Sequence, residues 1–206
     1  MPDCRGPARD KAETVVAGHF GLAAAVKAKE TSAQLWALML ATVWLDIVFI
    51  PLYAAGIETL EPLAGGGYGN VIIHADYTHS LVGALALAFL FGLIAARPWG
   101  RRVGVVLGAV VFSHWLLDLI VHRGDMPLLP GNAGGLPLLG FGVWRLPAAS
   151  MGIELGLVVG GSLAYYSAAR QVLRMAGAGD ERRARLLATL VAAAGILTLA
   201  LDVLVG

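Results

Sequence analysis

The chain has 206 residues, of which 58% are hydrophobic and only 14% are charged, and its mean hydropathy is +0.74. A soluble domain carries about 25% charged residues, so the composition excludes an ordinary soluble protein and indicates an integral membrane protein. The net charge of +1 gives no indication of a nucleic-acid partner. The single cysteine, Cys4, excludes an internal disulfide framework and a zinc site built on cysteines.

The chain is expected to form one all-α membrane domain, residues 1–206, a polytopic transmembrane helix bundle with five clear spans. Residues 1–13 are polar and are expected to form a flexible N-terminus. The apolar stretch Thr14–Ala28 is short for a span, because crossing takes about 20 residues. It is expected to be a short crossing, re-entrant or interfacial helix. The five clear spans are Gln34–Ala55, Ser80–Ala96, Val103–Val121, Ser150–Ala169 and Leu186–Val205.

Two long loops separate these spans. The first, Gly56–Thr78, contains Glu58 and Glu61, which are expected to be solvated loop charges, and the glycine cluster Gly65–Gly69, which is expected to be a flexible connector. The second, residues 122–149, is rich in glycine and proline and is predicted to act as a lid over a site at its end of the bundle.

Basic residues orient the predicted bundle, because short loops rich in lysine and arginine face the cytoplasm. Three arginines lie in the turn 97–102, five lie between residues 170 and 185, and Lys27 and Lys29 fall on the same side. We therefore expect a multi-pass protein of a bacterial-type cytoplasmic (inner) membrane, with both long loops on the non-cytoplasmic side. The aromatic residues expected to anchor it in the interfacial belts are Tyr77, Trp99, Trp115 and Trp144.

The span Val103–Val121 leads into a stripe of ionisable residues. His114, Asp118 and His122 recur at four-residue intervals, and this spacing places them on one face of a helix. Ionisable groups at membrane depth are costly and indicate a functional site that faces the protein interior. The pair His114–Asp118 taken alone fits a structural hydrogen bond between helices equally well.

The predicted topology brings other ionisable groups to the same outer half of the membrane. Asp46 lies about 12 Å below the outer end of its span at a helical rise of 1.5 Å per residue. His79 opens the next span, and Glu154 lies about one helical turn inside the fourth. His19 reaches this level only if Thr14–Ala28 enters from the outside. The other polar residues at this level are His74, Asp76, Ser80 and Ser113.

Imidazole and carboxylate ligands without thiolate favour zinc, manganese or iron, and zinc is the first expectation for a mixed His/Asp site. A divalent metal would offset the burial of the carboxylates and would support metal-assisted hydrolysis. Glu154 is expected to be a ligand, a partner of a ligand histidine or a counter-charge to Arg123 or Arg145.

Three segments together resemble a known family: Gly18–Ala24 with its histidine, Thr78-His79-Ser80, and Ser113–Asp118. Over roughly residues 14–125 the chain resembles the bacterial membrane-bound metal-dependent hydrolases of the YdjM type. That family's pattern implies metal ligands in an N-terminal His, an Asp in the next helix, an H-R-G-x-T-H-S segment and an S-H-x-x-x-D segment. Carried over residue by residue, these ligands are His19, Asp46, His74, His79, His114 and Asp118.

This sequence departs from the family pattern in two places. His74-Ala75-Asp76 stands where H-R-G is expected, which removes the arginine and any role it has in holding phosphate. The Pro-Asp-x-Asp expected around Asp46 is also missing, because Val43, Trp44 and Leu45 precede this aspartate.

The resulting prediction is a hydrolase that uses one or two divalent metal ions, zinc first, on an ester or phosphoester. A site about 10 Å below the surface meets lipid head groups first, so membrane lipids or a lipid-like small molecule are the expected substrates and partners. The predicted metal ligands are His19, Asp46, His79, His114 and Asp118. The predicted further ligand or general base is His74, Asp76 or Glu154, and His122, Ser80 and Ser113 are placed at the rim or behind the ligands.

Two other functions fit the same residues. A metal-ion or proton-coupled transporter also uses His-x-x-x-Asp on membrane helices, but usually with a site at the midplane and inverted repeats, and this sequence shows no repeat. A structural membrane protein with a stabilising metal would bind the metal without turnover.

Overall fold

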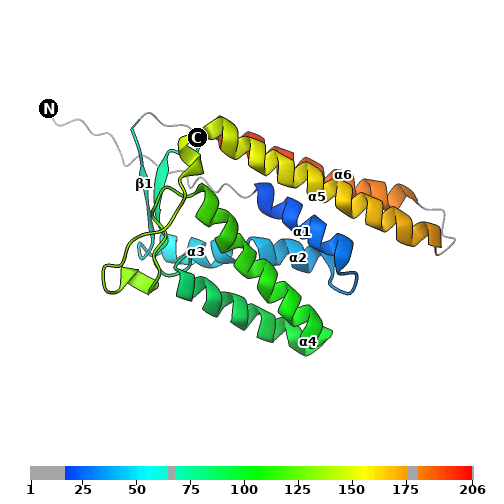
Figure 1. Cartoon of the computed structure of the whole chain (residues 1–206). Coiled ribbons are helices and arrows are strands. Elements are labelled where there is room, and N and C mark those ends of the chain that lie inside the picture. Colours follow the sequence, from blue (N-terminus) through cyan, green and yellow to red (C-terminus); the bar gives the residue numbers. More distant parts are fainter. Residues whose placement is uncertain (1–16, 65–67, 176–180, 206) are drawn as a thin grey trace.

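The computed structural model describes residues 17–64, 68–175 and 181–205, so the predicted flexible N-terminus, residues 1–13, lies outside the described residues. The described chain is mostly helical, with a small sheet at one end (Figure 1). In chain order the elements are α1 (Ala17–Lys29), α2 (Leu35–Thr42), α3 (Trp44–Ala54), β1 (Thr59–Pro62), β2 (Val71–His74), α4 (Leu81–Val121), the 3-10 turns η1 (Pro130–Asn132) and η2 (Val143–Arg145), α5 (Pro147–Met175) and α6 (Glu181–Val205).

Within the described ranges, three helices are long and apolar enough to cross a membrane, namely α4, α5 and the Ala184–Leu201 part of α6. A fourth candidate is the pair α2 and α3, which are bent by 45° at Val43. This count is lower than the five predicted spans because the predicted spans Ser80–Ala96 and Val103–Val121 are one helical element, α4. The α1 helix, with 13 residues, is not among the candidates.

Helix α4 folds back on itself at Gly100. This residue has φ 82° and ψ 161° and follows Pro98, which interrupts helical hydrogen bonding. The two halves lie side by side (Figure 1), and a Cβ atom on Gly104 would lie 2.5 Å from the carbonyl oxygen of Gly92. The fold-back brings the beginning of α4, near His79, beside its end.

The segment Gly56–Thr78, which we predicted to be irregular, contains an antiparallel hairpin, so the all-α prediction is wrong here. Strands β1 and β2 pair with Thr59 opposite His74 and Pro62 opposite Val71. The β-branched run Val71–Ile73 favours a strand. Val71 packs with Tyr68, Val121 and Trp144 in a small apolar cluster. The hairpin therefore has an apolar core of its own at the end of the helices.

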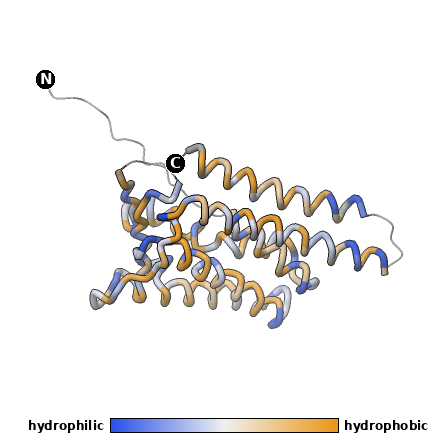
Figure 2. The backbone as a smooth tube through the Cα atoms, turned by 45° about the horizontal axis from the view of Figure 1, so that its top comes forward, coloured by the Kyte–Doolittle hydropathy of each residue, from blue (hydrophilic) through white to orange (hydrophobic). Residues whose placement is uncertain are grey.

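The basic residues of the turn 97–102 and of the last turn of α1 lie at the end of the bundle opposite the hairpin (Figure 1), in stretches that are hydrophilic in Figure 2. Arg123 and Arg145, by contrast, lie at the hairpin end. The fold-back of α4 and the end of α1 meet there, where Arg102 Nε lies 3.0 Å from Glu30 Oε2. Residues 122–149 lie at the hairpin end, and the backbone N–H groups of Leu81 and Val82 donate to carbonyls of this loop. The loop is thus fastened to the beginning of α4.

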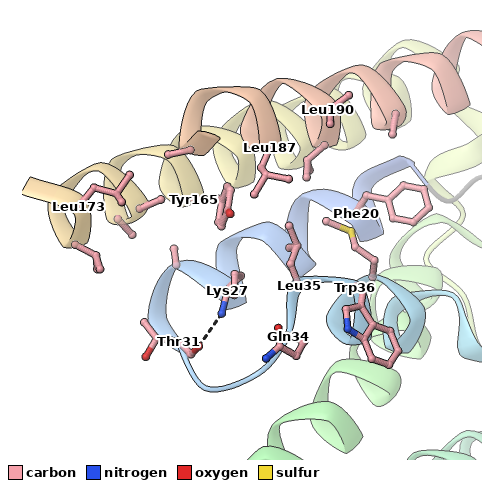
Figure 3. A pocket seen from close by; sticks show the side chains of 18 residues that line it. Phe20, Lys27, Thr31, Gln34, Leu35, Trp36, Tyr165, Leu173, Leu187 and Leu190 are labelled. Atoms are coloured by element: carbon pink, nitrogen blue, oxygen red, sulfur yellow. Dashed lines mark hydrogen bonds between the residues drawn. The ribbon is translucent and has the colours of Figure 1, made fainter. Parts of the chain in front are cut away.

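A separate apolar groove of about 1040 Å³ runs between α1, α2, α5 and α6 (Figure 3). It extends along α1 from Phe20 to Lys27, whose ammonium donates to the carbonyls of Thr31 and Ala33 at 2.7 Å each. No histidine or carboxylate lines the groove in the described part of the chain, so it offers no metal ligand.

Candidate metal centre

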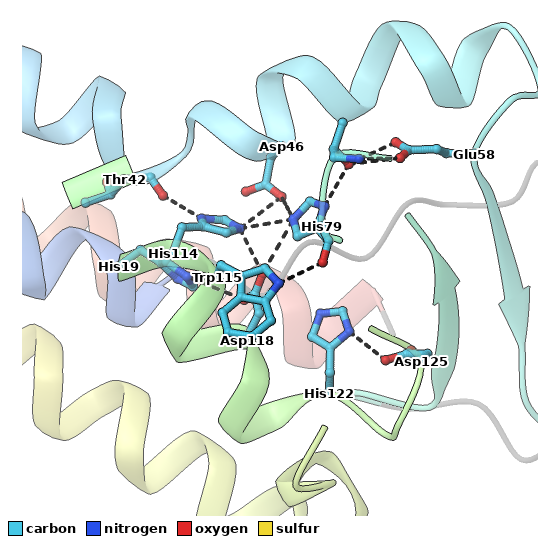
Figure 4. A network of polar contacts seen from close by, with 11 residues as sticks. His19, Thr42, Asp46, Glu58, His79, His114, Trp115, Asp118, His122 and Asp125 are labelled. Carbon is cyan, nitrogen blue, oxygen red and sulfur yellow. Dashed lines mark hydrogen bonds and ion pairs between the residues drawn. The ribbon is translucent and has the colours of Figure 1, made fainter. Parts of the chain in front are cut away.

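Two groups of buried ligand atoms meet between α1, α3 and α4 (Figure 4). One group is His19, His114 and Asp118, the other is Asp46, His79 and His114, and within each group the atoms lie within 4.8 Å of one another. His114 belongs to both, so the two groups form one cluster. The structure therefore brings together all five residues that the sequence predicts as metal ligands.

The distances in this cluster are short. His114 Nε2 lies 2.9 Å from Asp118 Oδ2 and 3.5 Å from Asp46 Oδ1. His79 Nε2 lies 3.5 Å and 3.6 Å from the same two oxygens, and 3.3 Å from His114 Nε2. All three histidines and Asp118 are buried, and Asp46 is slightly more open. The cluster is thus a compact, largely dehydrated set of nitrogen and carboxylate oxygen atoms.

The structure also decides whether His19 reaches this cluster. His19 lies near the beginning of α1, and its Nε2 is 3.5 Å from Asp118 Oδ1. Its ring stacks at a tilt on His114, with 4.2 Å between the centroids. The short N-terminal helix therefore contributes its histidine to the cluster.

In His114 and His79, hydrogen bonds hold the Nδ1 atom, which is the ring nitrogen that points away from the cluster. His114 Nδ1 lies 2.6 Å from the Thr42 carbonyl, which accepts only, so this nitrogen carries a hydrogen. The Thr42 carbonyl lies at the bend between α2 and α3, where the regular helical ladder is interrupted at Val43. His79 Nδ1 lies 2.8 Å from the Thr78 hydroxyl. Both rings thus turn their Nε2 atoms toward the cluster.

This arrangement fits a bound cation. With hydrogens on both Nδ1 atoms, the neutral rings of His79 and His114 present Nε2 lone pairs to each other and to two carboxylates. His19 Nε2 and Asp46 Oδ2 are also buried and have no hydrogen-bond partner among the described residues. Such converging acceptors repel one another unless a positive charge lies among them, and imidazole with carboxylate is a donor set that zinc accepts.

His122 was predicted at the rim, but the structure buries it beside the cluster. Its ring centroid lies 6.4 Å from that of His79, and its Nδ1 is 2.8 Å from Asp125 Oδ1. Burial alone would lower the pKa of His122, but the Asp125 hydrogen bond and the nearby carboxylates raise it above its ordinary value. Burial alone would raise the pKa of Asp125, but its bond to His122 lowers it. Each partner thus favours the charged form of the other.

Glu154 flanks the cluster without joining either ligand group. It is buried on α5, where the Tyr68 hydroxyl donates to Oε1, while Oε2 is buried without a partner among the described residues. A Cβ on Gly18, the residue before His19, would lie 3.4 Å from Glu154 Cγ. Arg123 and Arg145 donate instead to the carbonyls of Gly69 and Arg123. These contacts favour the predicted role of Glu154 as a partner behind His19. They do not favour its alternative role as a counter-charge to Arg123 or Arg145.

Two predicted site residues lie away from the cluster. His74 ends β2, and its Nε2 is 3.3 Å from Glu61 Oε2, with the two side chains 45% and 62% exposed. Asp76 is half-buried, and its carbonyl accepts from the N–H of Gly131. In the described chain neither residue belongs to a ligand group. The hairpin, which the sequence did not predict, places His74 on its solvated side.

The two predicted serines have local structural contacts. Ser80 is the N-cap of α4, because its hydroxyl accepts from the N–H of Gly83 at 3.0 Å. It also donates to the Tyr77 carbonyl. The Ser113 hydroxyl donates to the Val110 carbonyl at 2.6 Å. All of these hydrogen bonds go to backbone atoms, so none of them joins a serine to a predicted metal ligand.

The sequence did not predict the burial of four residues beside the cluster, namely Glu58, Trp115, Asp125 and Trp144. Glu58, predicted to be solvated, is 0% exposed and lies behind Thr78 and His79. Trp115, predicted as an interfacial anchor, is buried, and its indole N–H donates to the His79 carbonyl at 2.8 Å. Trp144, also predicted as an anchor, is likewise buried. Asp125 could have been found from its three-residue spacing from His122, whereas Glu58 lies in a loop whose path the sequence does not reveal.

Comparison with known families identifies the family of this chain. A family model described as YdjM inner membrane protein matches residues 13–203 of the chain. The chain belongs to the YdjM inner membrane protein family. The match extends through the C-terminal helices α5 and α6, beyond the segments that carry the resemblance in the sequence. No curated protein and no solved structure matches the chain.

Proposed function

We propose that this YdjM-family protein is a metal-dependent hydrolase that cleaves an ester or phosphoester of a lipid-like molecule at the membrane boundary. The observation that carries the proposal is the gathering of three buried imidazoles and two carboxylates into two ligand groups that share His114, with the Nε2 atoms of His79 and His114 3.3 Å apart. Burying so many acceptor atoms is costly unless they hold a cation.

In this proposal Asp46, His79, His114 and Asp118 hold a divalent ion, zinc first, and His19 completes the set. Such an ion, when bound, acts as a Lewis acid toward a carbonyl or phosphoryl oxygen and makes water acidic enough to be a nucleophile near neutral pH. The Asp118 carboxylate directs Oδ1 to His19 and Oδ2 to His79 and His114. It therefore links the two ligand groups, and this accommodates one ion or two.

Glu154 is the proposed general base. Its buried Oε2 has no hydrogen-bond partner among the described residues and is available to accept a proton. The Tyr68 hydroxyl donates to the other oxygen, Oε1, and is itself hydrogen-bonded to the Ser150 hydroxyl. His74 and Asp76 are left out of this role because the structure places them away from the ligand groups.

We propose five membrane crossings, with the centre on the non-cytoplasmic side. The α2–α3 pair, each half of α4, α5 and α6 would each cross once. Among the described residues, ten arginines and lysines belong to the helix ends and turns opposite the hairpin and only Arg123 and Arg145 lie at the hairpin end, which supports this orientation by the positive-inside rule. The cluster lies toward the hairpin end of α4, so it would face the periplasmic boundary.

A lipid-like substrate is supported by the apolar surroundings of the cluster. The groove along α1 begins at Phe20, the residue after His19, and is lined largely by apolar side chains (Figure 3). Residues 122–149 cover the outer end and expose Phe141 and Leu146. We propose that this loop is a lid, and that substrate enters from the membrane with its head group at the centre.

Metal analysis of the purified protein in detergent tests the proposal. The wild type should contain about one or two divalent ions per chain, and His114→Ala should lose them, while the exposed His74→Ala should retain them. Removing the metal with a chelator should abolish hydrolysis in a panel of lipid esters and phosphoesters, and zinc should restore it. A wild-type protein that is free of metal and insensitive to chelators would overturn the proposal, and zinc flux in proteoliposomes without turnover would assign the cluster to transport.

A further inference from the structure

A fully buried carboxylate stands behind His79, on the side away from the cluster (Figure 4). Glu58 Oε1 accepts from the backbone N–H groups of Tyr77 and Thr78 at 2.9 and 2.8 Å. Both carboxylate oxygens lie 3.0 Å from the Thr78 hydroxyl. Two backbone N–H groups and one hydroxyl therefore surround this side chain, and a buried carboxylate needs such hydrogen-bond donors.

These contacts determine where the hydrogens lie. An ionised carboxylate only accepts, so the single hydrogen of the Thr78 hydroxyl goes to Glu58. The Thr78 oxygen must then accept from its other neighbour, His79 Nδ1, at 2.8 Å. The hydrogen of the neutral His79 ring is thereby placed on Nδ1, and the lone pair on Nε2, which is the atom that faces Asp46, His114 and Asp118.

We propose that Glu58 and Thr78 are positioning residues that hold His79 in the Nδ1–H tautomer and aim its Nε2 at the metal. The inference rests on the proposed function for the identity of what Nε2 binds. Residues that orient a ligand histidine in this way typically contribute about 10–100-fold to metal affinity. For His114 the same task falls to the Thr42 backbone carbonyl, which no side-chain substitution removes.

The hydrogen-bonded chain Glu58–Thr78–His79, here called the relay, also connects His79 to the helix that carries Asp46. The backbone N–H groups of Ile57 and Glu58 donate to the carbonyl of Leu52 in α3, so Glu58 is anchored on the last turns of that helix. Asp46 lies in the first turn of the same helix. The Trp115 indole holds the His79 carbonyl from the opposite side. One continuous hydrogen-bond network thus fixes the positions of two proposed ligands, His79 and Asp46, which come from different elements.

Substitutions at Thr78 test the relay with little change of shape. Thr78→Val removes the hydroxyl and keeps the volume, whereas Thr78→Ser keeps the hydroxyl. We expect Thr78→Val to weaken zinc binding about 10–100-fold in competition with a chelator, and Thr78→Ser to bind like the wild type. Glu58→Gln should weaken binding in the same direction, while Glu61→Gln, an exposed glutamate of the same hairpin, should not.

Two measurements separate positioning from a merely structural role. ¹⁵N spectra of the metal-free protein should show His79 protonated at Nδ1 in the wild type and in Thr78→Ser, and a loss of this preference in Thr78→Val. If Thr78→Val binds zinc as tightly as the wild type, or if both Thr78 variants lose affinity equally, the proposal is wrong. A wild type that shows this tautomer but binds no metal would retain the relay and overturn only the proposed hydrolase.

Discussion

The pair His122–Asp125 shows how a single contact governs the pH response next to the cluster. Asp125 also accepts from the N–H of Ile73 through Oδ2, at 2.9 Å, so it joins the end of α4 to the hairpin. Each partner shifts the other's pKa toward the charged form against the effect of burial. The pair therefore contributes to stability only while both groups are charged.

We predict that Asp125→Asn lowers the free energy of unfolding by about 1–3 kcal/mol, because a neutral amide replaces the carboxylate that balances the charge of the buried His122. The raised pKa of His122 makes its contribution complete below about pH 6.5, and this contribution is lost as the pH rises through the folded pKa. The lowered pKa of Asp125 makes its contribution complete above about pH 3.9, and this is lost as the pH falls through the folded pKa. The difference from wild type should thus be largest between about pH 4 and 6.5.

Thermal unfolding in detergent across this pH range measures the difference. Glu61→Gln is the matched control, because the exposed pair Glu61–His74 should contribute little at any pH. A difference between wild type and Asp125→Asn that does not decrease on the alkaline side would show that the pair is a neutral hydrogen bond.

At the scale of elements, two glycines allow α1 to lie directly on α5. A Cβ on Gly161 would lie 1.9 Å from the carbonyl oxygen of Gly21, and a Cβ on Gly21 would lie 2.1 Å from that of Leu157. Real Cβ atoms do not approach so closely, so the two backbones touch because neither residue has a side chain. His19 lies on α1 two residues before Gly21, so this contact determines how deeply it enters the cluster.

We predict that Gly161→Ala destabilises the protein by about 1–3 kcal/mol, because α1 must move away to admit the methyl group. Zinc affinity should fall as well, since the displacement carries His19 away from Asp118. Gly160→Ala is the control on the same helix, because a Cβ there meets nothing within 4 Å in the described chain. Thermal unfolding and zinc titration of both variants test this, and equal effects at the two positions would contradict the close contact.

At the scale of the whole molecule, most basic residues and the ligand cluster lie at opposite ends of the helices. Most basic residues of the described chain lie around the fold-back of α4 and the ends of α1, α5 and α6. The hairpin, the 122–149 loop with Arg123 and Arg145, and the ligand cluster lie at the other end (Figure 1). This separation suits a site that works at one membrane surface. A carrier would require access to its site from both sides.

Cysteine labelling in intact cells tests this orientation. In a Cys4→Ser background, we predict that Glu61→Cys in the hairpin reacts with a membrane-impermeant maleimide, because the proposed orientation places the hairpin at the periplasmic side. Arg101→Cys, at the fold-back, should react only after the cells are lysed. Labelling of Arg101→Cys in intact cells, with Glu61→Cys protected, would reverse the proposed orientation.

The helical segments and the ligand residues could be predicted from local properties of the sequence. Apolar runs revealed the helices, because burial in a bilayer demands them over about 20 residues, and the four-residue spacing of His114 and Asp118 revealed a shared helical face. The turn 97–102 was equally visible, since Pro98 and the charged residues around it interrupt the apolar pattern. Each of these signals lies within one continuous stretch of about 20 residues or fewer.

The tertiary structure alone decided which polar residues meet. Glu58 and Glu61 are three positions apart in one loop, yet Glu58 is fully buried behind His79 while Glu61 is exposed beside His74. His19 reaches Asp118 because Gly21 and Gly161 allow α1 to pack closely on α5. Burial and proximity at these positions depend on backbones that are 20 to 140 residues apart, and no local pattern carries that information.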